Sequence, residues 1–167
     1  MMSGPEVLEI LDALAGEGIA AWVDGGWGVD ALLREQTREH EDLDVVIALA
    51  DGEKAEEALS ALGFWLSEDE RPTRFVLGHG DGRRIDFHTV VFDEEGGGLQ
   101  GLQDGRSYRY PPEGFAGEGV IDGRAARCLT PEVQLECHLG YEPDETDRHD
   151  MRLLAERFGL RLPRVYR

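Results

Sequence analysis

Residues 24–47 read DGGWGVDALLREQTREHEDLDVVI, and this stretch decides the fold. Gly25 and Gly26 follow a short apolar run and precede a segment whose apolar residues recur at helical spacing. A polar loop follows, and Asp42 and Asp44 then open a run of β-branched residues. The order predicts a strand, a glycine turn, a helix, a loop and a second strand.

The two aspartates and the two glycines predict two halves of one binding site. Residues two apart in a strand project from the same face, so Asp42 and Asp44 would lie side by side, roughly 7 Å apart at the backbone. Paired carboxylates favour Mg²⁺, which typically binds one or two of them together with substrate phosphates. The Gly25-Gly26 turn before a helix suits phosphate. The pattern indicates a nucleoside triphosphate with its Mg²⁺.

The same stretch resembles the signature of the nucleotidyltransferase superfamily. Residues 24–30 (DGGWGVD) and 37–45 (TREHEDLDV) are similar to its antibiotic-modifying members, the aminoglycoside 2''-nucleotidyltransferases and the lincosamide nucleotidyltransferases. The resemblance is strongest over residues 22–47 and extends to Asp86. It implies an α/β (α+β) nucleotidyltransferase fold, with a mixed twisted sheet flanked by helices and a short C-terminal helical part.

Asp86 is the candidate for a third carboxylate at the site. Alternation along the predicted strand 84–91 places Arg84, Asp86 and His88 on one face. In the resembling family, a third carboxylate on a later strand completes the metal site or takes the proton from the acceptor hydroxyl. The alternative is that Asp86 forms an ion pair with Arg84 or another arginine.

The rest of the chain predicts one domain over residues 1–167, with a catalytic core at 1–128 and C-terminal helices at 129–167. Residues 93–118 are rich in Gly, Glu and Asp and predict a long irregular stretch. The other expected elements are helices at 4–16, 52–62 (capped by Asp51), 132–139 and 146–158, strands at 64–67 and 74–77, and a hairpin at 120–125.

Composition restricts the partners. The chain has 35 acidic and 17 basic residues and a net charge of −18, which argues against a long nucleic acid and favours a cationic small molecule. A merely solvated surface is the alternative explanation. No apolar run is long enough to span a bilayer and no secretory pattern opens the chain, so we expect a cytoplasmic protein. Cys128 and Cys137 lack zinc-ligand spacing.

The expected reaction is transfer of AMP from ATP to a hydroxyl of a small acceptor, with release of pyrophosphate. The catalytic and metal-binding candidates are Asp42, Asp44 and Asp86, with Asp86 also a candidate general base. The candidates for binding the phosphates are Gly25, Gly26 and Arg38. We expect an aminoglycoside acceptor and a monomer or homodimer. The alternatives are a lincosamide acceptor, a toxin–antitoxin type enzyme acting on protein or tRNA, and a catalytically silent nucleotide-binding module.

Several further residues are weaker candidates. Those for the acceptor pocket are Tyr108 and Tyr110 as walls and Glu94 and Glu95 as ammonium partners. Those from the C-terminal helices are His138, Tyr141, Asp147 and Asp150, for which helix capping is the alternative. Trp27 is expected to pack beneath the glycine turn, and Asp30 to cap or brace the loop.

Overall fold

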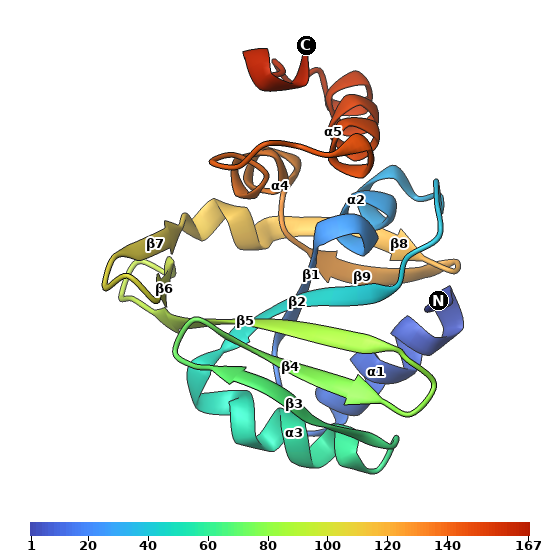
Figure 1. The fold of residues 1–167 in the computed structure, drawn as a ribbon, viewed down its shortest axis with the longest axis vertical. Helices are drawn as coiled ribbons and strands as arrows, with labels where there is room; N and C mark the ends of the chain where they lie inside the picture. Colours follow the sequence, from blue (N-terminus) through green and yellow to red (C-terminus); the bar gives the residue numbers. More distant parts are fainter.

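The computed structural model describes residues 1–167, and a mixed β-sheet runs through its centre (Figure 1). The strand order is β3-β4-β5-β2-β1-β9-β8. β2 is parallel to β5 and β1 to β9, while the other neighbours are antiparallel. The bounds are β1 Ala21–Asp24, β2 Asp42–Ala48, β3 Phe64–Glu70, β4 Arg74–His79, β5 Arg84–Phe92, β8 Gly117–Ile121 and β9 Arg124–Cys128.

Two groups of helices flank the sheet (Figure 1). α1 and α3 pack against each other near β3, whereas α2, α4 and α5 pack together near β8 and β9. Short 3₁₀ turns join some of the elements. The helices are α1 Gly4–Gly16, α2 Gly25–Leu33, α3 Gly52–Ser60, α4 Pro131–Cys137 and α5 Glu145–Phe158, and the 3₁₀ turns are η1 Leu49–Asp51, η2 Pro112–Ala116 and η3 Arg164–Tyr166. No helix is long and apolar enough for a membrane crossing.

The alternation of residues along β2 separates the core from the candidate site. Leu43, Val45 and Ile47 are fully buried and belong to the main core, as do Ile85 and Phe87 of β5. Full burial of each such side chain contributes about 1.5–3 kcal/mol. Because successive strand residues point to opposite faces, this burial fixes the register and directs the intervening acidic residues to the other face.

The prediction of an irregular stretch at 93–118 is wrong. It contains a hairpin formed by β6 (Gly98–Gly101) and β7 (Ser107–Tyr110), with β6 also paired to β5. Gly98 faces Phe115 and Val90 so closely that a Cβ would lie 2.9 Å from the Phe115 ring. Tertiary packing therefore requires glycine at this strand position, so the segment lacks the β-branched residues from which a strand is usually predicted.

Two smaller expectations also differ from the structure. The Asp51 side chain makes no capping hydrogen bond at the start of α3, because η1 leads directly into that helix. The apolar spacing within the predicted helix 146–158 also places Phe158 inward, but its side chain is 40% exposed. It is the last residue of α5, and Gly159 (φ 68°) turns the chain immediately after it, so the ring is only partly covered.

Candidate active site

The strand register aligns three carboxylates across adjacent strands. In the parallel pair β2/β5, Asp44 lies opposite Asp86. In the antiparallel pair β1/β2, Asp44 also lies opposite Asp24. Residues directly opposite one another share a face of the sheet, so the three side chains lie on the face away from Leu43 and Val45. Asp24 is buried, and its Oδ1 accepts a hydrogen bond from the Gly25 N–H at 2.7 Å.

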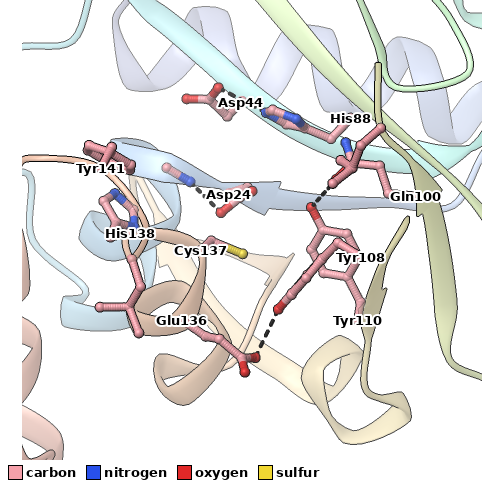
Figure 2. A pocket seen from close by; sticks show the side chains of 13 residues that line it. Asp24, Asp44, His88, Gln100, Tyr108, Tyr110, Glu136, Cys137, His138 and Tyr141 are labelled. Atoms are coloured by element: carbon pink, nitrogen blue, oxygen red, sulfur yellow. Dashed lines mark hydrogen bonds and ion pairs between the residues drawn. The ribbon is translucent and has the colours of Figure 1, made fainter. Parts of the chain in front are cut away.

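Asp44, Asp86 and His88 form a compact cluster of potential ligands. One ligand atom from each lies within 4.8 Å of the others, and each side chain is about a quarter exposed. His88 Nε2 is 3.4 Å from Asp44 Oδ1 (Figure 2). Asp42 is exposed, lies opposite Arg84 one step earlier in the register, and is not part of this cluster. The structure therefore brings together Asp44 and Asp86, with His88 as a third member.

Several negatively charged carboxylates lie close together at this site. Burial raises the pKa of the Asp44 carboxyl, the charges of Asp24 and Asp42 raise it further, and His88 opposes them. Burial by itself would lower the pKa of His88, but the hydrogen bond to Asp44 and the surrounding carboxylates raise it to about 9. The surrounding carboxylates thus favour the protonated imidazole, as they would favour another cation near Asp44.

Asp86 is held by one oxygen and free at the other. Arg74 Nη1 donates to Asp86 Oδ2 at 2.6 Å, and Arg74 also binds Glu68 and Glu70. Asp86 Oδ1 is buried and has no hydrogen-bond partner. Arg84 binds Glu68 instead. The ion pair considered as the alternative for Asp86 thus exists, but it is made by Arg74 and leaves the second oxygen available.

These residues fit a divalent cation such as Mg²⁺. Two carboxylates on adjacent strands supply hard oxygen ligands, which Mg²⁺ prefers. A buried carboxylate oxygen without a partner is costly, and a bound cation would remove that cost. Asp42 and Asp24 add negative charge near Asp44.

The glycine corner lies directly against the acidic cluster. Gly25 has φ 58°, in the left-handed region, and a Cβ there would overlap the Asp44 carboxylate. A Cβ at Gly26 would lie 2.5 Å from His40 Nδ1 and would overlap the Arg38 guanidinium. Both positions therefore require glycine. The free N–H groups of the first turn of α2 open beside Asp44, where phosphate would bind.

A buried network braces the loop between α2 and β2. The Asp30 carboxylate accepts hydrogen bonds from the N–H (3.1 Å) and hydroxyl (2.7 Å) of Thr37, and its other oxygen lies 2.5 Å from His40 Nε2. The Trp27 ring is buried, with its centroid 4.8 Å from that of His40. The expectations that Asp30 braces the loop and that Trp27 packs beneath the turn are confirmed.

Arg38 links the same loop to the C-terminal helix. Its Nε and Nη2 donate to the two carboxylate oxygens of Asp150 at 2.9 and 2.7 Å, and Nη1 donates to the Glu39 carbonyl. Asp150 is buried on α5. The guanidinium therefore lies over Gly26 in a fixed orientation, and the charge of Arg38 is already paired.

A cavity of about 520 Å³ opens from the acidic cluster (Figure 2). Its walls come from the β1–α2 corner, β2, β5, the β6–β7 hairpin, and α4 with the residues that follow it. The lining residues are Asp24, Gly25, Asp44, His88, Gln100, Leu102, Tyr108, Tyr110, Glu136, Cys137, His138, Leu139 and Tyr141.

Four of the weaker candidates line this cavity and four do not. Tyr108, Tyr110, His138 and Tyr141 contribute to the walls. The other four lie elsewhere: Glu94 is exposed on the turn before β6, Glu95 binds Arg109, Asp147 belongs to the capping box of α5, and Asp150 binds Arg38.

Sequence reasoning did not single out three residues of the site. His88 lies two residues after Asp86, so alternation along the strand was the available signal. Asp24 is opposite Asp44 only because β1 pairs with β2, and Glu136 reaches the cavity only because α4 packs beside the hairpin. Tertiary structure alone reveals these two.

Paired carboxylates on neighbouring strands, next to a glycine corner at the start of a helix, define a nucleotidyltransferase. The chain belongs to the aminoglycoside-2''-adenylyltransferase family, whose model matches residues 6–154. This confirms the resemblance to antibiotic-modifying nucleotidyltransferases.

Individual relatives agree with this assignment. A lincosamide resistance protein from Staphylococcus haemolyticus is 32% identical over 149 residues, covering 89% of this chain and 92% of the relative. A 2''-aminoglycoside nucleotidyltransferase from Klebsiella pneumoniae is 31% identical over 125 residues, covering 75% of this chain and 66% of the relative. The family and the fold confirm an enzyme of the nucleotidyltransferase class.

Solved structures show the same fold. The lincosamide antibiotic adenylyltransferase LnuA, bound to lincomycin, aligns with a TM-score of 0.82 and 31% identity, covering 92% of this chain and 96% of that chain. ANT(2")-Ia in complex with adenylyl-2"-tobramycin aligns with a TM-score of 0.72 and 22% identity, covering 93% of this chain and 89% of that chain. The second match is evidence for the fold alone.

Proposed function

We propose that this protein transfers AMP from ATP to a hydroxyl of a lincosamide-type antibiotic and releases pyrophosphate. The observation that carries the proposal is the register pairing of Asp44 with Asp86 beside the glycine corner, at one end of a cavity of drug-like size. Nucleotide and acceptor would meet at this point, with the triphosphate at the corner and the acceptor in the cavity.

Asp44 and Asp86, with Asp42 nearby, would hold Mg²⁺. When bound, the ion supplies charge neutralisation for the triphosphate and lowers the pKa of the attacking hydroxyl. The N–H groups in the first turn of α2 bind the phosphates, and Gly26 leaves room for the Arg38 guanidinium to pack against that turn. Asp24 fixes the start of the helix through its bond to the Gly25 N–H.

Asp86 is suited to receive the proton of the acceptor hydroxyl. Arg74 holds the carboxylate in place through Oδ2, and this carboxylate is the proposed base beside the cation site. The acceptor oxygen attacks the α-phosphorus, the bond from that phosphorus to the bridging oxygen breaks, and pyrophosphate leaves with the electron pair. His88 lies beside Asp44, with its Nε2 3.4 Å from Asp44 Oδ1.

A lincosamide is the preferred acceptor for two reasons. The lincosamide resistance protein has nearly the same length as this chain, since the match covers 92% of it. The cavity walls include Tyr108, Tyr110 and Leu102, which suit a single acceptor with apolar surface. The second candidate is an aminoglycoside, as expected from the sequence, because the family model bears that name and the net charge of −18 attracts a polycation.

The test is to incubate the protein with MgATP and separate panels of lincosamides and aminoglycosides, and to measure pyrophosphate and product mass. We expect a lincosamide product heavier by one adenylyl group. Product from aminoglycosides alone would establish the second candidate. Transfer only to a protein or to tRNA would support the toxin–antitoxin alternative, and nucleotide binding without any turnover would support a silent module.

A further inference from the structure

The far wall of the cavity carries a carboxylate that the reaction does not use. Figure 2 shows Asp44 and His88 on one side of the cavity and Glu136 with Tyr108 on the other. The Tyr108 hydroxyl donates to Glu136 Oε2 at 2.8 Å. Tyr108 is in turn packed edge-on against Tyr110, with ring centroids 4.7 Å apart. The hairpin therefore orients Glu136 toward the cavity through Tyr108.

Glu136 is an exposed carboxylate of the cavity lining that forms no ion pair. Asp24 caps α2, and Asp44 lies beside His88. Glu136 forms no ion pair, and its Oε1 has no hydrogen-bond partner. The cavity lining includes no lysine or arginine. The acceptor wall therefore presents one unmatched negative charge among aromatic and apolar side chains.

A second groove meets the cavity at the same residue. This groove, of about 580 Å³, shares Glu136 and Leu139 with the cavity and continues along the other side of α4. Its lining also contains Glu113 and Glu132. An acceptor larger than the cavity would extend past Glu136 into this groove, so Glu136 lies where a cationic group of either acceptor class would pass.

We infer that Glu136 binds a protonated amine of the acceptor and is the residue that selects amine-bearing antibiotics. The inference rests on the proposed function and names the recognition element within it. Lincosamides and aminoglycosides both combine sugar hydroxyls with basic amines. With the amine at Glu136 and a hydroxyl near Asp44 on the opposite wall, the acceptor would span the cavity.

The experiment measures lincomycin binding by titration calorimetry and transfer kinetics for wild type, Glu136→Gln and Glu136→Asp. We expect Glu136→Gln to raise the Kd and KM for lincomycin about tenfold, as for loss of a hydrogen bond to a charged group. The KM for ATP should stay within about twofold, because Glu136 lies on the wall opposite Asp44 and His88. Glu136→Asp should retain part of the affinity.

A neutral acceptor separates a charge effect from a structural one. The N-acetyl derivative of N-demethyl-lincomycin keeps the hydroxyls but has no basic nitrogen, so its weaker binding should be the same for wild type and Glu136→Gln. The matched control is Glu53→Gln, which makes the same charge change on exposed α3, away from the cavity, and should leave lincomycin binding unchanged.

The outcomes distinguish this inference from the proposed function. Turnover with an unchanged lincomycin Kd in Glu136→Gln, or an equal loss for the neutral derivative, would overturn the role of Glu136 and leave the function intact. Absence of transfer in wild type would refute the function, while the calorimetric comparison would still test Glu136. If wild type binds tobramycin instead, the same variant comparison applies to tobramycin, and failure to bind either compound would overturn the inference.

Discussion

Asp44 of β2 and Asp86 of β5 lie directly opposite each other in a parallel register, and Arg74 holds one oxygen of Asp86 while the other remains unpaired. The packing of the core thereby positions the two carboxylates of the proposed reaction centre. The register is set by apolar residues on the opposite face of the same strands, so core packing determines the distance between the two carboxylates.

The first prediction concerns the cation. Because like charges at Asp44 and Asp86 repel, we expect Mg²⁺ to stabilise the wild-type protein, adding about 2.7 kcal/mol to the free energy of unfolding when its concentration is a hundred times Kd. Chelation should abolish transfer, and readdition of Mg²⁺ should restore it. Thermal unfolding with and without Mg²⁺ is the measurement. In Asp44→Asn the stabilisation should disappear, and an equal shift in both proteins would place the ion elsewhere.

The second prediction concerns the glycine corner. Gly25→Ala should abolish transfer, because its methyl group would displace the Asp44 carboxylate in addition to the left-handed backbone strain of about 1 kcal/mol. Gly18→Ala is the matched control: its φ is 72° but it faces open space, so it should cost stability alone. Denaturant unfolding and transfer rates of both variants check this. Full activity in Gly25→Ala would refute the contact.

The third prediction concerns the buried brace. His40→Ala leaves one oxygen of Asp30 without its partner, and we expect a loss of about 3 kcal/mol in the free energy of unfolding. Measured by urea denaturation, the double variant Asp30→Ala/His40→Ala should lose less than the sum of the two single variants. Additive losses would mean that the two side chains do not stabilise each other.

The fourth prediction concerns Arg38. We expect Arg38→Ala to raise the KM for ATP about tenfold and to leave the KM for the acceptor unchanged, because the guanidinium lies over Gly26. Asp150→Asn should cause a smaller change in the same direction, since it removes the charge that fixes Arg38. Arg124→Ala, an exposed arginine of β9 that pairs with Asp12 and does not line the cavity, is the control. The measurement is steady-state kinetics in which the concentrations of ATP and of the acceptor are varied separately. A change in acceptor KM alone would contradict the placement.

The sequence was most informative where local patterns control structure. The Asp-Gly-Gly turn, the Asp-x-Asp strand and the alternation around Asp86 predicted the order of elements and the face that Asp44 and Asp86 share. The sequence Ser3-Gly4-Pro5-Glu6 likewise predicts a capping box at the start of α1, and the structure contains it.

The rest depended on contacts between distant segments. The β6–β7 hairpin was missed because Gly98 is required by close packing against Phe115 and Val90, and glycine has a low strand propensity. Arg74, and not Arg84, binds Asp86, because the antiparallel pairing of β4 with β5 sets which arginine is near. The order of residues along the chain contains little information about such partners.

The most direct test of the central claim is the turnover of Asp86→Asn at saturating MgATP and lincomycin, with product mass and pyrophosphate followed together. The account predicts a loss of kcat of about a thousandfold or more, because the substitution removes both a cation ligand and the group that receives the proton, with the midpoint of unfolding close to that of wild type. Turnover within about tenfold of wild type would contradict it, because the Asp44–Asp86 pair would then not be the reaction centre.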